Sequence, residues 1–281
     1  MPKHLWVKMY TRTTRMSSQQ PFVSILTPTY NRRRFIPQLI EYVKHQTYPV
    51  AKREWLVLDD GTDPVEDLLA PHIASLNIRY IRSEEKLNIG AKRNRLNKEA
   101  RGEILVCMDD DDYYPPERVA YAVNSLLSHP RYQICGSSKN HIYFTDDNTI
   151  WAVGPYMTVP QGPTTHATFG TMAFTKRYAE KHPLNDFDTY AEEVQFTNRY
   201  KEPLLQLADP AKVMLVMNHS ENTKNKNDLR SAKDPHIRKT PMKLRNFISS
   251  VKHREFYVGL TAALYGASQA TAVTTEKKTE E

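Results

Sequence analysis

Four consecutive aspartates, 109–112, directly follow the apolar run 104–108. Such an apolar run is typical of a strand buried in a parallel sheet, so the carboxylates are expected where that strand leaves the core. Adjacent anions are costly unless a cation or water neutralises them. Carboxylate oxygens suit Mg²⁺ or Mn²⁺, and alternate residues of a strand share a face, which puts Asp109 and Asp111 together. The run predicts a metal site; a solvated acidic loop is the alternative.

A strand followed by a helix recurs four times in the first half of the chain. The expected strands are 22–27, 55–58, 78–81 and 104–108, and the expected helices are 33–45, 65–75, 89–100 and 115–128. This alternation is typical of an α/β fold with a parallel sheet and helices on both faces. Ligands of such sheets bind beyond the carboxyl ends of the strands. Three of these ends carry polar segments, which are 27–31, 59–62 and the acid run.

The second half is less regular, and we expect a flexible leader (1–20), one domain (21–220) and a basic C-terminal extension (221–281). Short strands are expected at 132–135, 142–144, 150–153 and 212–217, and helices at 176–181 and 190–200. A loop rich in Pro, Gly and Thr covers 154–170. The extension contains a short apolar helix, 256–267, and an end that we expect to be disordered.

Charge and cysteine content restrict the partners and the compartment. The net charge of +7 favours anionic partners such as phosphates, although much of it lies near the ends of the chain. The basic tail has no groove-reading or base-stacking motif, so no specific nucleic acid is expected. No apolar run reaches the ~18 to 20 residues of a membrane span. Cys107 and Cys135 lie in apolar segments typical of free thiols. A cytoplasmic protein is predicted, with a peripheral membrane contact through the extension left open.

Five segments in order resemble the family 2 glycosyltransferases with the GT-A fold. They are 23–32, 57–62, 88–94, 109–118 and 192–199, and the resemblance covers about residues 22–220. It implies a Rossmann-like, mostly parallel sheet flanked by helices, followed by the C-terminal extension. It also implies transfer of a sugar from a nucleotide-sugar donor (a UDP-, GDP- or TDP-sugar) to a hydroxyl of a glycan or other acceptor.

The resemblance implies a donor site built from the first four segments. The Tyr30 ring and the short polar groups of the first segment would hold the nucleoside. An aspartate of the 57–62 turn would accept a hydrogen bond from the base or the ribose. Arg93 would contact phosphate oxygens. The implied donor-binding residues are Thr27, Thr29, Tyr30, Asp59, Asp60, Arg93, Asn94, Asp109 and Asp110. Asp59 and Asp60 have a structural alternative, which is to cap the following helix.

The acid run matches the Asp-x-Asp motif of the resembled family. Asp111 would bind Mn²⁺ or Mg²⁺ at the donor diphosphate, and Asp109 would lie beside the ribose or the metal. His219, which follows an apolar strand, is a further candidate ligand, although a lone histidine is more often structural. The metal would stabilise the charge that develops on the leaving group.

The fifth segment supplies the candidate general base. Glu193 occupies the second position of the family's acidic pair, where the family usually has Asp, and Glu192 is the alternative. A carboxylate there would take the proton of the acceptor hydroxyl. The alternative is a helix start with acids in its first turn. No obvious protein nucleophile is present, so inversion is predicted. The resemblance places His166 and Thr168 on the side of the site that binds the acceptor. The rings of Trp151 and Tyr156 either stack on a sugar or pack in the core.

The same motifs can be checked against the residues that other activities require. A haloacid-dehalogenase-type phosphatase needs a nucleophilic Asp where Leu58 stands, and a calcium loop lacks its glycine and closing glutamate, so both are excluded. A sugar-phosphate nucleotidyltransferase would use the same acids and metal, but the turn after the first strand lacks glycine. A nucleotide-sugar or anionic-surface binding module without catalysis is the non-enzymatic alternative.

Overall fold

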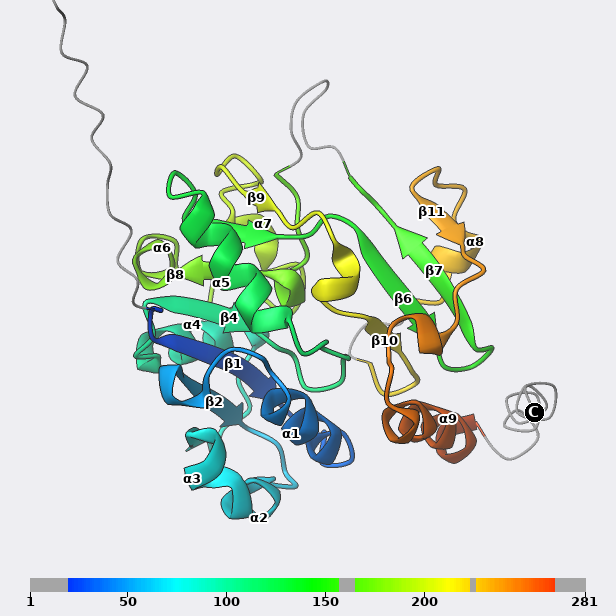
Figure 1. Ribbon diagram of the computed structural model, residues 1–281, viewed down its shortest axis with the longest axis horizontal. Coiled ribbons are helices and arrows are strands. Elements are labelled where there is room, and N and C mark those ends of the chain that lie inside the picture. Colours follow the sequence, from blue (N-terminus) through cyan, green and yellow to red (C-terminus); the bar gives the residue numbers. More distant parts are fainter. Residues whose placement is uncertain (1–19, 157–164, 223–225, 266–281) are drawn as a thin grey trace, which may run out of the picture.

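The computed structural model describes residues 20–156, 165–222 and 226–265 (Figure 1). The leader predicted for 1–20, apart from Gln20, and the disordered end predicted within 266–281 lie outside the described residues, as does part of the loop predicted for 154–170.

The main sheet has seven strands in the order β3-β2-β1-β4-β8-β5-β9. Strands β1 to β4 are parallel neighbours and match the four strands predicted from the sequence. β8 runs antiparallel to β4 and β5, and β9 is parallel to β5. The bounds are β1 Val23–Thr29, β2 Arg53–Asp59, β3 Ile78–Arg82, β4 Ile104–Cys107, β5 Ile134–Gly136, β8 Ala173–Thr175 and β9 Leu205–Gln206.

Helices cover both faces of this sheet, because successive strand residues point into two separate cores. Ile25 and Val57 face one core, which α1, α5 and α9 cover, whereas Leu26 and Leu58 face the other, beneath α4, α6 and α7. The predicted α/β class with a mostly parallel sheet is confirmed. The helices are α1 Ile36–Lys44, α2 Glu66–Leu69, α3 Ile73–Leu76, α4 Ile89–Glu99, α5 Arg118–Ser128, α6 Lys176–Lys181, α7 Glu193–Phe196, α8 Asp228–Ser231 and α9 Val251–Tyr265.

Three predicted elements differ from the structure. The helix predicted over 65–75 is divided into α2, a 3-10 turn and α3, because Pro71 in its middle lacks an N–H. The helix predicted over 190–200 is reduced to α7, since Ala191 before it and residues 198–200 after it have left-handed backbone, with φ between 50° and 60°. The strand predicted over 212–217 begins only at Val216, after a 3-10 turn.

A second sheet, with the order β10-β6-β7-β11, lies beside the main one (Figure 1). Its strands are β6 Asn140–Phe144, β7 Thr149–Val153, β10 Val216–Asn218 and β11 Ile237–Lys239. The sequence did not predict β11. Leu215, just before β10, exchanges two backbone hydrogen bonds with Tyr113, just after the acid run. This pairing brings the start of β10 close to the end of β4.

The C-terminal extension contributes to the main core. α9 overlaps the apolar helix predicted at 256–267 but begins earlier, and residues 266 and 267 lie outside the described residues. Ile248, Tyr257 and Leu260 are buried in the same core as α1, and the hydroxyls of Tyr257 and Tyr42 are 2.9 Å apart. In the described part of the chain, no helix has the length and apolar character needed to cross a membrane.

Tyr257→Ala should lower the free energy of unfolding by about 3–5 kcal/mol, since it removes a buried ring from the core. Tyr257→Phe should cost about 1 kcal/mol, because only the hydroxyl contact is lost. Urea unfolding measures both. Phe187→Ala is the control, since Phe187 is 83% exposed and its loss should change stability by less than about 0.5 kcal/mol. A Tyr257→Ala cost no larger than that of the control would contradict the packing of α9.

Candidate functional site

The four aspartates of the acid run contact different partners. β4 ends at Cys107, so these residues form a loop, and the alternation expected of a strand does not apply to them. Asp109 pairs with Arg93 of α4, at 3.1 Å between Oδ1 and Nη1. Asp111 Oδ2 lies 3.3 Å from His219 Nε2, and Asp112 accepts the N–H of Met217 at 2.8 Å. The run is therefore a junction between the main sheet and β10.

Protonation differs among these acids. Burial, followed by the charge of Asp111, raises the pKa of Asp110 to about 8 and holds that of Asp112 well above its usual range. Burial also opposes ionisation of Asp111, but the hydrogen bond and charge of His219 bring its pKa below the ordinary value. Near neutral pH the ionised member of these three is therefore Asp111, which is the carboxylate predicted to bind the metal.

The donor atoms around Asp111 fit a divalent ion that takes most of its ligands from substrate and water. The side-chain amide of Asn222 donates to Asp111 Oδ2 at 3.1 Å, beside His219 Nε2. The His219 ring is held by the N–H of Glu221 and by the ring of Phe35, 4.7 Å away between centroids. Within residues 20–156, 165–222 and 226–265, no group of three or more His, Cys, Asp or Glu forms a ready metal cage. One carboxylate plus phosphate oxygens is a usual way to hold Mg²⁺, and the added imidazole suits Mn²⁺.

The end of β2 carries two buried aspartates with different surroundings. Asp59 accepts the N–H groups of Gly61 and Val65 at 2.8 and 3.0 Å and the hydroxyl of Tyr80 at 2.8 Å. These bonds fix the turn between β2 and α2, and the N-cap of α2 is Val65, without a side-chain cap. Asp60 forms an ion pair with Lys92 and accepts the N–H of Leu87 at 2.7 Å.

The end of β1 contributes a ring and two hydroxyls. The Tyr30 ring lies between two ammonium groups, with Lys86 Nζ 4.3 Å and Lys92 Nζ 5.4 Å from its centroid. The hydroxyl of Thr27 is already bonded to Met108 O and Trp55 Nε1, whereas the buried Thr29 Oγ1 has no hydrogen-bond partner. Thr29 and Tyr30 are therefore the residues at this strand end with bonding or stacking capacity to offer a ligand.

Arg93 connects the acid run with the acidic pair. Its buried guanidinium donates from Nε to Glu192 Oε1 at 2.7 Å and from Nη1 and Nη2 to Asp109 at 3.1 and 3.4 Å. It also lies over the Phe169 ring, 4.1 Å from the centroid. Burial alone lowers the pKa of Arg93, but the charges of Asp109 and Glu192 raise it above its usual value. All three nitrogens are thus engaged, and the predicted contact with phosphate stays a prediction.

Asn94, the next residue of α4, contacts the chain just before the acidic pair. Its side chain bonds both backbone groups of Leu184, at 2.8 and 2.9 Å, and Asp186 at 2.7 Å. Gly90 lies close to the same segment, where a Cβ would meet Asn185 O at 1.9 Å. These contacts fix the segment that leads into α7, so the predicted donor contact of Asn94 would require them to be exchanged.

The two glutamates at the start of α7 are differently placed. Glu192 is 7% exposed and is bonded to Arg93, whereas Glu193 is half-buried. Phe196, in the same short helix, is fully buried among aromatic rings of Phe169 and Phe174. α7 is therefore anchored in the core, and Glu193 is the more accessible carboxylate of the pair.

The residues predicted on the acceptor side lie together near β6. His166 Nδ1 is 2.9 Å from Ser138 Oγ, and Thr168 Oγ1 accepts from Asn140 Nδ2 at 3.2 Å. Both predicted residues are half-buried. Their contact with an acceptor stays a prediction.

Sequence reasoning assigned no role to Arg32 or Asn222, and it left Lys92 as either an aid to Arg93 at the phosphates or a solvated side chain. Arg32 Nε lies 3.6 Å from Asp111 Oδ2, Lys92 pairs with Asp60, and Asn222 contacts Asp111 and His219. Arg32 and Lys92 belong to the segments that carry the family resemblance. That resemblance was the sequence signal that could have identified them as site residues. Asn222 follows His219 by three residues, but nothing in the sequence shows that this turn meets the acid run.

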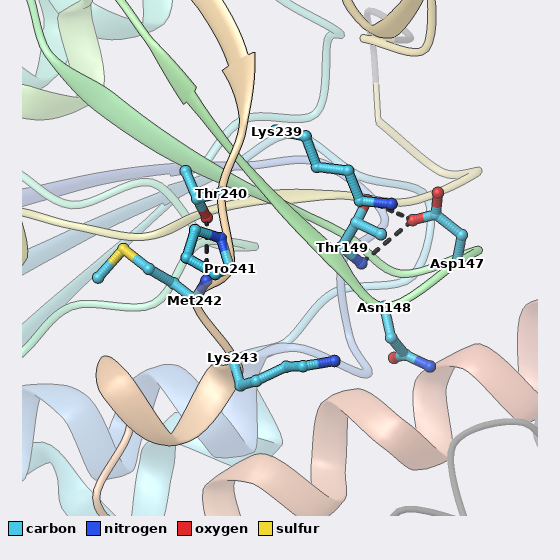
Figure 2. Close-up of a pocket in the computed structure, with 8 residues that line it drawn as sticks. All are labelled: Asp147, Asn148, Thr149, Lys239, Thr240, Pro241, Met242 and Lys243. Carbon is cyan, nitrogen blue, oxygen red and sulfur yellow. Dashed lines mark hydrogen bonds between the residues drawn. The ribbon is translucent and has the colours of Figure 1, made fainter.

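A cavity of about 230 Å³ lies elsewhere, between the β6–β7 turn and the end of β11 (Figure 2). Asp147, Thr149, Lys239 and Lys243 are among its lining residues, and Asp147 accepts two hydrogen bonds from Thr149. None of its lining residues belongs to the acid run or to the acidic pair, so it is separate from the candidate site.

Comparison with known families decides the classification. The family described as "Glycosyl transferase family 2" matches residues 24–182. The chain belongs to this family. Family 2 relatives include glycosyltransferase AglE of Haloferax volcanii, 33% identical over 98 residues, which are 34% of this chain and 32% of AglE. The putative colanic acid biosynthesis glycosyl transferase WcaA of Escherichia coli is 25% identical over 216 residues, covering 72% of this chain and 74% of WcaA.

Solved structures show that this family 2 chain has the GT-A fold. Staphylococcus aureus TarS superposes with a TM-score of 0.54 at 19% identity, over 70% of this chain and 36% of TarS. The mannosyltransferase PcManGT of Pyrobaculum calidifontis, determined with GDP-Man and Mn²⁺, gives 0.55 at 14% identity, over 94% of this chain and 77% of PcManGT. The chain thus spans about a third of AglE and of TarS.

Asp110→Asn should stabilise the metal-free protein in a pH-dependent way. The pKa of Asp110 is about 8 in the folded state, against an ordinary value of 3.8, so the folded protein binds the extra proton between these values. Stability is therefore lost as pH rises through that window and stays low above it. The advantage of the variant should be small near pH 4 and reach a few kcal/mol at about pH 8.

Urea unfolding in EDTA at several pH values measures this difference. Glu84→Gln is the control, because the Glu84 side chain is 88% exposed and its charge should contribute no such dependence. An advantage of Asp110→Asn that does not change with pH would show that Asp110 is ionised throughout.

Proposed function

We propose that the protein transfers a sugar from a nucleotide-diphosphate donor to an acceptor hydroxyl, with a divalent cation and with inversion at the anomeric carbon. The observation that carries the proposal is the convergence of three groups at the carboxyl ends of β1, β2 and β4. They are the Tyr30 ring, the Asp60–Lys92 pair and the Asp111–His219 pair. Together they offer a stacking surface, buried charges of both signs and hard oxygen ligands, which are what a nucleoside diphosphate and its metal require.

In this proposal the nucleoside lies against Tyr30 and Thr29, with Asp60 as the acceptor of its hydrogen bonds. Asp111 holds Mn²⁺ or Mg²⁺. For His219 to be a second ligand through Nε2, its Nδ1 must carry the ring proton and release the N–H of Glu221. A metal bound there supplies electrostatic stabilisation of the leaving diphosphate. Arg32, 3.6 Å from Asp111, adds a positive charge beside the same oxygens.

Glu193 is proposed as the general base. It is half-buried at the start of an anchored helix and is therefore more accessible than Glu192, which is 7% exposed. A single accessible carboxylate suits direct attack by the acceptor oxygen: the carboxylate takes the hydroxyl proton while the new glycosidic bond forms and the diphosphate leaves. That displacement inverts the anomeric carbon.

Asp111→Ala should reduce metal-dependent release of nucleoside diphosphate by roughly a thousandfold, because several kcal/mol of stabilisation are lost with the ion. Release is measured from a panel of UDP-, GDP- and TDP-sugars with Mn²⁺, with and without EDTA, water serving as the slow acceptor. Glu84→Ala is the surface control. Full activity of Asp111→Ala, or of the wild type in EDTA, would contradict the metal site. No release from any donor, with no nucleotide binding in calorimetry, would favour a non-catalytic binding module.

Glu193→Gln should lower the rate of transfer to water by about 10²- to 10⁴-fold, the usual contribution of a general base. Donor affinity in calorimetry should stay within twofold or so, because the variant keeps the shape of the side chain. Glu180→Gln, on the exposed face of α6, is the matched control. A normal rate for Glu193→Gln together with loss in Glu192→Gln would transfer the role to Glu192.

A further inference from the structure

The cavity of Figure 2 is formed by two segments that are far apart in the sequence. They are residues 147–149, in the β6–β7 turn, and residues 239–243, which lead from the end of β11 to the 3-10 turn Leu244–Asn246. Its volume of about 230 Å³ is below the ~300–1,000 Å³ of sites that enclose drug-sized ligands. The cavity therefore suits a small ligand, or one group of a larger molecule, and is too small for a whole nucleotide sugar.

Two lysines give the cavity its positive charge. Figure 2 shows the side chains of Lys239 and Lys243 extending toward the β6–β7 turn. In the part of the chain that the structure describes, no carboxylate forms an ion pair with Lys239. Two ammonium groups beside one small cavity repel each other, and an anion between them relieves that repulsion.

The carboxylate that lines the cavity is already engaged. Asp147 Oδ2 lies 2.9 Å from Arg230 Nη1, and Asp147 Oδ1 accepts the N–H and the hydroxyl of Thr149 at 3.1 and 2.6 Å. Arg230 also pairs with Asp146, at 2.6 Å. One arginine thus compensates one of two carboxylates, and the two lysines leave this group of side chains with a net positive charge.

The turn adds a neutral donor. Asn148 is half-buried and has a left-handed backbone, with φ 55°. Its Oδ1 accepts the hydroxyl of Tyr143, which leaves the two N–H groups of Nδ2 to donate. The cavity therefore combines two cations with an amide donor, which is a set of groups that binds oxyanions.

The backbone that carries the lysines is fixed on the second sheet. Lys239 pairs with Trp151 in the β7–β11 ladder. The N–H and the hydroxyl of Thr240 both donate to Ile150 O, at 2.9 and 2.8 Å, and the N–H of Met242 donates to Thr240 Oγ1 at 3.3 Å. Binding of an anion would therefore require ordering of side chains only, which limits its entropic cost.

The surrounding sequence is strongly basic. Residues 226–254 contain nine Lys or Arg and two Asp, so this segment has the same net charge, +7, as the whole chain. The rest of the chain is neutral overall. A concentrated positive field of this kind raises the local concentration of anions around the cavity.

We propose that this cavity is a phosphate-binding site, separate from the acid run, that takes the phosphomonoester group of a soluble molecule or of an anionic lipid. The ammonium groups of Lys239 and Lys243 would bind phosphate oxygens as point charges, and Asn148 would donate to a further oxygen. A dianionic phosphate suits two cations better than a singly charged carboxylate does. The inference does not depend on the proposed glycosyltransferase activity, and it gives the basic C-terminal extension a ligand.

The test uses the full chain with ¹³C in the methyl groups of its methionines. Met242 lines the cavity, whereas Met214 Cε lies beside Gly170, which borders Asp109 of the acid run. One spectrum therefore reports on both places, and Met242→Leu assigns the cavity signal. Inorganic phosphate and glycerol 3-phosphate, titrated at constant ionic strength, should each shift the Met242 signal in a saturable way.

The double variant Lys239→Gln/Lys243→Gln should weaken the phosphate affinity read from Met242 by about tenfold or more, because two charge-assisted contacts are lost. Lys239→Arg/Lys243→Arg keeps both charges and should keep most of the affinity. The matched control is Lys233→Gln/Lys252→Gln, which removes two exposed charges of the same basic segment outside the cavity. It should change the affinity by about twofold or less, because exposed charges at a distance are screened by salt.

Sedimentation with vesicles of phosphatidylcholine, with and without phosphatidic acid, distinguishes the two sources of phosphate. Binding to the phosphatidic acid vesicles that is lost in Lys239→Gln/Lys243→Gln would assign the site to a lipid. A saturable Met242 shift without vesicle binding would assign it to a soluble phosphate. The proposal is overturned if neither soluble phosphates nor phosphatidic acid vesicles change the Met242 signal, if only Met214 responds, or if the control pair weakens binding as much as the cavity pair.

Discussion

The guanidinium of Arg93 joins two carboxylates that the sequence places far apart. It bonds Asp109, at the end of β4, and Glu192, just before α7. A buried arginine is tolerated when each charge has a partner, and removing one partner from such a group is strongly destabilising. The distance between the metal side and the base side of the site therefore depends on this one side chain. The stacking of Arg93 on Phe169 ties the same group to the aromatic cluster that anchors α7.

The metal side of the site depends on segments that follow the repeating strand–helix units of the first half of the sequence. β10 belongs to the second sheet and carries His219 to Asp111. Phe35 of the first half packs against His219, and Phe256 of α9 packs against Phe35, with centroids 6.1 Å apart. The C-terminal extension is thus a structural support of the proposed metal site.

The parallel half of the fold could be predicted because its signals are local. β1, β2 and β4 contain apolar runs that end in polar residues, and α4 and α5 are single uninterrupted helices. The break at Pro71 was also visible in the sequence, but the helix was predicted through it. The second sheet could not be read in the same way, since β11 is a short, partly exposed strand whose pairing with β7 spans more than eighty residues.

The candidate site could also be predicted only where its signals are local. The acid run of Asp109 to Asp112 could be recognised from the sequence, but its partners come from distant segments. The bonds of Arg93 to Asp109 and Glu192 could therefore not be predicted, and its contact with phosphate stays a prediction. The extent of α7 was overestimated because Arg199 and Tyr200 give no sequence signal for left-handed backbone, although Asn198 is of a residue type that favours it. Those three residues turn the chain so that the Tyr200 ring lies beside His166.

A crystal structure with Mn²⁺ and a nucleoside diphosphate would locate the donor and its metal. We expect an anomalous manganese peak bonded to Asp111 and to diphosphate oxygens, the nucleoside beside Tyr30, and Arg93 still bridging Asp109 and Glu192. A nucleotide bound away from the ends of β1, β2 and β4 would contradict the site. An Arg93 that left both carboxylates to bind the diphosphate would contradict the role given to it here.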